Sequence, residues 1–117
     1  MRLNRMAGND QQYEWLAPWE PVDDGDTSLV SELIREVSTA HCLFGVDAVA
    51  LATNSAPDHY DDVLFGIDLP DNKFAMVHLT WKPETLADFP STILYRDWEH
   101  FVTDGMMPDN EAYLRDW

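Results

Sequence analysis

Three observations predict that this chain of 117 residues folds as a single α+β domain. The length suits one domain and is too short for two ordinary ones. The composition is 45% apolar and 12% aromatic, which supplies a hydrophobic core in spite of the charge. Strand-like runs are grouped between two helical patterns. We therefore expect an antiparallel sheet of three to four strands, with two helices packed mainly on one face.

Residues 1–26 are expected to form an N-terminal arm in front of a single domain over residues 27–117. Pro18 and Pro21 exclude one continuous helix here, because proline lacks a backbone N–H and restricts the residue before it. The arm also carries Trp15 and Trp19, and side chains of this size are rarely left in water. We expect them to pack on their own domain, with a partner surface as the alternative.

A helix is predicted over residues 27–39. Its apolar residues recur with the 3.6-residue period of one helix face: Leu29, Val30, Leu33, Ile34 and Val37. The charged residues Glu32, Arg35 and Glu36 are expected on the other side.

Strands are predicted at residues 46–52, 63–69 and 74–81, with a short fourth strand at 92–95. The sequence Pro70-Asp71-Asn72 favours a turn, so the second and third strands should form a hairpin. A second helix is predicted over residues 97–107, capped by Asp97 and ended by Pro108.

A tight hairpin would place Asp62 opposite Thr80 and diagonal to His78 on the same face. These three residues form a possible polar site, since a carboxylate can orient an imidazole for proton transfer. The alternative is a half-buried structural histidine, which we favour because threonine is a poor nucleophile without a strong base.

The charge balance limits the kinds of partner. There are 22 acids against 7 bases, a net charge of -15, which argues against binding to nucleic acids or anionic membranes. Residues 36–72 contain seven acids, but they contain no lysine or arginine. We expect a surface for a basic protein partner, with solubility alone as the alternative. Its candidate residues are Asp58, Asp61, Asp62, Asp68 and Asp71, together with Trp15 and Trp19.

No cofactor or metal is expected. The chain has five glycines and lacks the glycine-rich patterns that hold phosphates. The cluster Asp58, His59, Asp61 and Asp62 matches no calcium loop, so we expect a solvated loop there. The single cysteine, Cys42, is typical of a reducing compartment. With no apolar run long enough to span a bilayer and no visible signal peptide, we expect a cytoplasmic protein.

Three segments carry a resemblance to known sequences: Asp61-Asp62-Val63-Leu64-Phe65, Val77-His78-Leu79-Thr80-Trp81 and Met107-Pro108-Asp109. Together they resemble a family of small uncharacterised bacterial proteins. The resemblance covers roughly residues 29–113, and the crossing at Lys82-Pro83-Glu84 is shorter here. It implies no catalytic residue. The family is loosely associated with the immunity proteins of bacterial toxin systems.

We therefore expect a small acidic binding protein without catalysis, and the resemblance suggests an immunity-type inhibitor of a basic partner. Two alternatives stay open. One is a small enzyme that uses His78 and Asp62, and the other is a homodimeric structural protein that buries its tryptophans.

Overall fold

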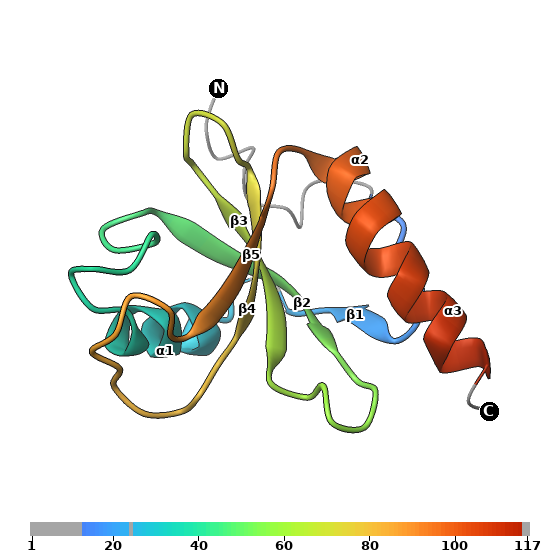
Figure 1. Cartoon of the computed structure of the whole chain (residues 1–117). Coiled ribbons are helices and arrows are strands. Elements are labelled where there is room, and N and C mark those ends of the chain that lie inside the picture. The colour runs from blue at the N-terminus through green and yellow to red at the C-terminus, as the bar shows by residue number, and fades with distance from the viewer. Residues whose placement is uncertain (1–12, 24, 116–117) are drawn as a thin grey trace.

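The computed structural model describes residues 13–23 and 25–115. A five-stranded antiparallel sheet forms its centre, and the strands are neighbours in chain order. They are β1 (Trp19–Pro21), β2 (Ala48–Asn54), β3 (Asp62–Ile67), β4 (Phe74–His78) and β5 (Ser91–Tyr95). The helices are α1 (Ser28–Glu36), α2 (Trp98–Phe101) and α3 (Met107–Arg115), and a π-helical turn over Val102–Met106 joins the last two (Figure 1). Within residues 13–23 and 25–115, none of the helices has the length and apolar character that crossing a membrane requires.

The sheet has five strands, whereas the sequence predicts three to four. β1 pairs with β2, with Trp19 opposite Asn54 and Pro21 opposite Ala52. A proline is tolerated here because β1 is an edge strand, whose outer side needs no partner. This part of the predicted arm therefore belongs to the sheet, whereas residues 1–12 of the arm lie outside the described residues.

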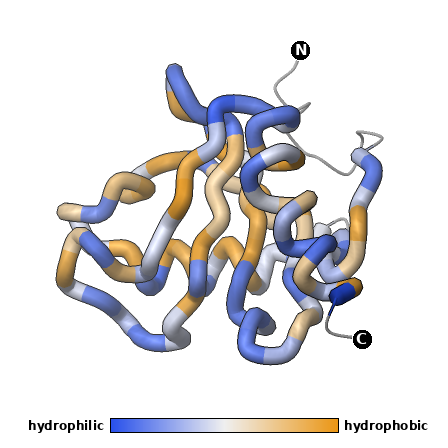
Figure 2. Tube along the Cα trace, turned by 45° about the vertical axis from the view of Figure 1, so that its right-hand side comes forward, coloured by the Kyte–Doolittle hydropathy of each residue, from blue (hydrophilic) through white to orange (hydrophobic). Residues whose placement is uncertain are grey.

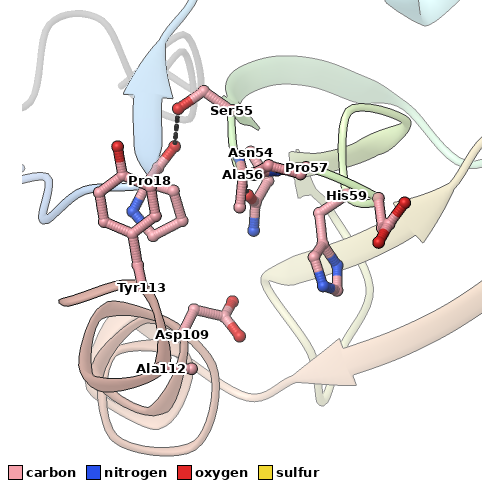
Figure 3. Close-up of a pocket in the computed structure, with 10 residues that line it drawn as sticks. Pro18, Asn54, Ser55, Ala56, Pro57, His59, Asp109, Ala112 and Tyr113 are labelled. Atoms are coloured by element: carbon pink, nitrogen blue, oxygen red, sulfur yellow. Dashed lines mark hydrogen bonds between the residues drawn. The ribbon is translucent and has the colours of Figure 1, made fainter. Parts of the chain in front are cut away.

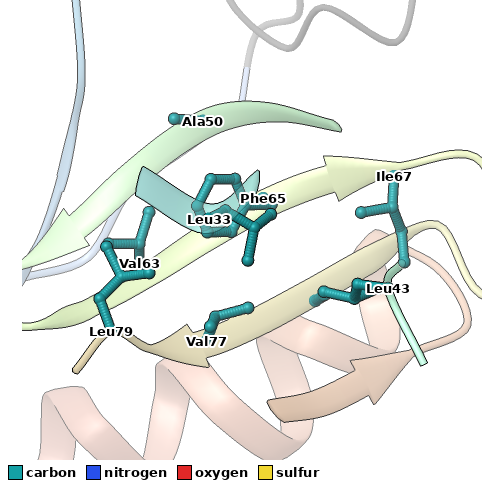
Figure 4. Packing of buried hydrophobic residues seen from close by; sticks show 9 residues of the cluster. Leu33, Leu43, Ala50, Val63, Phe65, Ile67, Val77 and Leu79 are labelled. Carbon is teal, nitrogen blue, oxygen red and sulfur yellow. The ribbon is translucent and has the colours of Figure 1, made fainter. Parts of the chain in front are cut away.

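The helices cover opposite faces of the sheet, which corrects the prediction that they share one face. Leu33 of α1 packs with Val63, Phe65 and Val77 on one side (Figure 4). Phe101 and Met106 pack with Trp19, Leu51 and Leu64 on the other side. β3 is buried along its whole length, because both alternating sets of its side chains meet a helix layer. Figure 2 shows the hydrophobic residues running along the central strands.

The second helical segment continues past Pro108, where the sequence predicts an end. Asp97 caps its start as expected, since its side chain accepts the His100 N–H at 2.9 Å. The Met107 N–H then bonds to the Val102 carbonyl, five residues back, which widens the turn. Pro108 becomes the second residue of α3, in a first turn where a missing N–H is tolerated.

The segment before β1 is fastened to this last helical region. The Trp19 indole N–H donates to Asp109 at 2.9 Å, and the Asn110 side chain donates to the Ala17 carbonyl at 2.6 Å. The Leu16 N–H also approaches the Met106 sulfur at 3.4 Å. Residues about 90 positions apart in sequence therefore hold one another in place.

The β3–β4 hairpin forms as predicted, but its register differs. Asp62 lies directly opposite His78, and Val63 lies opposite Val77. The predicted register placed Asp62 opposite Thr80. β4 ends at His78, and the chain then turns away from the sheet. The cause is a set of hydrogen bonds that Thr80 and Trp81 make with Glu36 of α1.

Candidate functional site

The buried carboxylate of Asp62 joins two histidines where β3 begins and β4 ends. His78 Nδ1 lies 2.7 Å from Asp62 Oδ1, and His59 Nδ1 lies 3.0 Å from Asp62 Oδ2. The Asp62 side chain is 11% exposed, whereas those of His59 and His78 are 55% and 48% exposed. One inaccessible carboxylate therefore holds two accessible imidazoles.

This geometry determines which nitrogen of each ring carries the proton. An ionised carboxylate only accepts hydrogen bonds, so each neutral histidine donates through Nδ1–H. Nε2 then carries a lone pair and is left for another group. Both rings can therefore accept a hydrogen bond or a proton on their outer side.

His59 lines a cavity of about 620 Å³ between the loop after β2 and α3. Figure 3 shows the His59 ring and the Asp109 carboxylate pointing into this space. Burial raises the pKa of the Asp109 carboxyl, while the hydrogen bond from the Trp19 indole acts in the opposite direction. The remaining residues that line the cavity are Pro18, Asn54, Ser55, Ala56, Pro57, Asp58, Ala112 and Tyr113.

His78 lines a second, more open recess of about 460 Å³. Three apolar side chains in it are exposed to solvent: Trp81, Leu86 and Phe89. Asp61 lies in the same recess and accepts the Trp81 indole N–H at 2.7 Å. The recess thus combines an aromatic surface with a carboxylate fixed beside it.

Glu36 holds Trp81 in this position from beneath. Its side chain is fully buried and accepts the Thr80 N–H at 2.8 Å and the Trp81 N–H at 2.7 Å. Trp81 has a φ of 63°, a left-handed conformation that is strained for a bulky residue. The expectation that Glu36 faces outward from α1 is therefore wrong.

Burial also affects the ionisation of Glu36. It raises the pKa of the Glu36 carboxyl, and the hydrogen bond to Glu32 adds to this effect. The N–H groups of Thr80 and Trp81 oppose it. The same hydrogen bond, together with Arg35, lowers the pKa of Glu32.

The predicted polar site is only partly assembled. Asp62 and His78 are brought together, but the Thr80 hydroxyl bonds to Glu36 Oε1 at 3.1 Å instead. His59, and not Thr80, is the third member of the cluster with Asp62 and His78. Its spacing of three residues from Asp62 is compatible with a turn that brings the two side chains together, which a sequence reading could have used.

The predicted acidic surface divides between the two ends of the sheet. Asp58 lines the His59 cavity and Asp61 the His78 recess. Asp68 and Asp71 lie in the β3–β4 turn at the other end (Figure 1), where Lys73 reaches Asp68 at 3.3 Å. Asp62 is buried and contributes no exposed charge.

Both tryptophans of the predicted arm pack on their own domain. Trp19 is 3% exposed, and its ring lies edge-on to Phe101 at 5.5 Å. Trp15 packs edge-on against Trp98, with ring centroids 5.1 Å apart. These rings cover one face of the sheet, as the sequence suggests for side chains of this size.

Residues 13–23 and 25–115 contain no group of three or more His, Cys, Asp or Glu side chains arranged to hold a metal ion. Comparisons with protein-family models, with curated proteins and with solved structures found no match to this chain.

Proposed function

We propose that this protein is a small binding protein that docks a basic partner protein without catalysing a reaction. Inhibition of a toxin-type enzyme is the specific form that the sequence resemblance suggests. The observation that carries the proposal is the exposed, fixed indole of Trp81 beside the carboxylate of Asp61.

The position of Trp81 supports a binding role because it is costly to maintain. A buried glutamate holds its backbone, the backbone is strained, and yet the side chain is left 51% exposed. Folding alone would favour a buried indole or a smaller residue there. An aromatic ring that is already fixed loses little conformational entropy when a partner covers it.

The surroundings of Trp81 favour a cationic side chain. The face of an indole attracts an ammonium or guanidinium group, and Asp61 supplies a carboxylate at the edge of the same ring. Leu86 and Phe89 add apolar contact for the stem of a lysine or arginine. The net charge of -15 would also steer a basic protein toward the surface.

The partner is first captured from the native host with the intact chain, identified and purified. Its association and dissociation rates are then measured by stopped flow at salt concentrations from about 50 to 500 mM, roughly a threefold change in screening length. The test variant is Asp58→Asn/Asp61→Asn. The matched control, Asp68→Asn/Asp71→Asn, removes two charges from the other end of the sheet.

We expect a basic partner whose association slows in the test variant and with added salt, while the control associates like the parent. Trp81→Ala should mainly speed dissociation, because it removes contact area rather than charge. An acidic partner, association that does not depend on salt, or equal effects of the two double variants would contradict the proposal.

A further inference from the structure

The cavity beside His59 and Asp109 has the size and chemistry of a ligand site that is separate from the Trp81 recess. Its volume of about 620 Å³ lies within the usual range for small-molecule sites. It is built from three parts of the chain that are remote in sequence: Pro18 before β1, the loop after β2, and α3.

Three side chains of the cavity, those of Asp58, His59 and Asp109, offer hydrogen-bond acceptors, while Asn54, Ser55 and Tyr113 carry groups that can also donate. A carboxylate offers about four acceptor sites, and Trp19 uses one of those on Asp109. His59 presents Nε2 as an acceptor because its Nδ1–H is committed to Asp62. Asp58 adds a second carboxylate, and no lysine or arginine is among the lining residues. A ligand that complements this cavity must therefore be rich in donors and positively charged.

We propose that this cavity binds a small organic cation with a guanidinium group, which donates to the Asp109 carboxylate and to His59 Nε2. A guanidinium has five N–H donors in a rigid plane and can reach acceptors in two directions at once, which an ammonium does less well. The apolar lining, Pro18, Ala56, Pro57 and Ala112, suits a short alkyl chain attached to that group.

The ionisation of Asp109 fits this ligand. Burial raises the pKa of its carboxyl, and a bound cation would favour the ionised form. Binding should therefore release protons near that pKa. The proposal does not rest on docking at Trp81, since the two sites have no lining residue in common.

The test uses the whole chain and two pairs of probes. Butylguanidinium is compared with butylurea, its uncharged counterpart of similar shape. N-acetylarginine amide is compared with N-acetylcitrulline amide. Binding is followed by isothermal titration and by backbone amide shifts. We expect both cations to bind and to shift the amides of residues 55–59 and 112, while the neutral partners bind at least about tenfold more weakly.

Three variants test whether butylguanidinium binds in the cavity beside His59 and Asp109. Asp109→Asn keeps the shape of the side chain and an acceptor for Trp19, and it should weaken butylguanidinium binding about tenfold or more. Ala112→Leu fills the cavity and should abolish binding even if Asp109→Asn alters the fold. Glu111→Gln removes the same charge from an exposed position on α3 and should leave binding unchanged.

The outcomes separate two sources of the guanidinium group. Binding of both cations supports a site that also admits an arginine side chain of a peptide or protein. Binding of butylguanidinium alone supports a site for a free small molecule. Equal binding of butylurea, or equal loss of affinity in Asp109→Asn and Glu111→Gln, would overturn the proposal.

Discussion

The buried carboxyl of Glu36 lies on the same face of α1 as Leu33, three residues earlier. With Leu29 and Leu33 it follows the spacing i, i+4, i+7, which marks a buried helix face. The sequence therefore contained a sign of its burial, but a charged residue is ordinarily assigned to the solvent side. What the sequence could not provide was the reason for burial, because Thr80 and Trp81 are more than 40 residues away.

Glu36→Gln should change how stability depends on pH. The folded-state pKa of Glu36 is raised above its ordinary value of 4.5, so its contribution to stability is present below pH 4.5 and is lost as the pH rises through the raised pKa. The free energy of unfolding of the parent should therefore fall, relative to that of the variant, as the pH increases above 4.5.

Urea unfolding at a series of pH values measures this difference. Glu111→Gln removes one exposed carboxyl from α3 and serves as the control for the loss of a single carboxyl. A difference between parent and Glu36→Gln that stays constant over the series would contradict the raised pKa.

The hydrogen bonds of three histidine rings predict that these residues adopt two different neutral tautomers. His59 and His78 should carry Nδ1–H because both donate to Asp62. His41 should carry Nε2–H, since its Nδ1 accepts the Leu43 N–H at 3.0 Å and its Nε2 lies 2.9 Å from the Pro90 carbonyl. Long-range ¹H–¹⁵N correlation at about pH 8, where an ordinary imidazole is neutral, distinguishes the forms. Finding Nε2–H on both His59 and His78 would rule out the joint role of Asp62.

At the scale of the element, the sequence predicted those parts that depend on neighbouring residues. The 3.6-residue pattern located α1, and the turn at Pro70–Asn72 located the β3–β4 hairpin. β1 could not be predicted in this way, because three residues with a proline become a strand only beside the edge of β2. The passage of the last helical segment through Pro108 likewise depends on contacts from outside that segment.

Gly105 allows the Phe101 ring and the Tyr95 hydroxyl to pack closely against the widened turn before Pro108. A Cβ there would lie 2.9 Å from two atoms of the Phe101 ring and 3.0 Å from the Tyr95 hydroxyl. Gly105→Ala should therefore destabilise the protein by about 1–3 kcal/mol through overpacking. The exposed Thr103 lies in the same turn, and Thr103→Ala should stay within about 0.5 kcal/mol of the parent. Thermal unfolding checks both, and equal melting temperatures for the two variants would contradict the close contact.

At the scale of the whole molecule, the site depends on three-dimensional assembly that no local pattern contains. The His59 cavity requires Pro18, the loop after β2 and α3 to meet. The loop is exposed at Asp58 and His59, as the sequence predicts, but Asp62 is buried and holds the His59 ring. The predicted single acidic surface is instead divided between two ends of the sheet, because the direction of β3 separates Asp58 and Asp61 from Asp68 and Asp71.

Trp19 and Trp81 allow a structural role of an indole to be distinguished from a binding role. Trp19 is 3% exposed and bonded to Asp109, so Trp19→Ala should cost about 3–5 kcal/mol. Trp81 is 51% exposed, so Trp81→Ala should cost less than about 1 kcal/mol. Urea unfolding gives both values. Native-state hydrogen exchange should also show faster opening of α3 in Trp19→Ala alone, and a large stability loss in Trp81→Ala would mean that the exposed indole is structural.

The fastening of residues 16–19 to residues 106–110 has a consequence for biosynthesis. During translation, all five strands leave the ribosome before the segment that covers one of their faces does. That face, which includes Leu51, Leu64 and Phe74, lacks the cover of Phe101 and Met106 until the last helical segment emerges, and only residues before β2, such as Trp19, can pack on it earlier. Folding of the domain is then completed only after residues 98–115 have left the ribosome, and until that moment this part of the apolar face is open to chaperones or to other nascent chains.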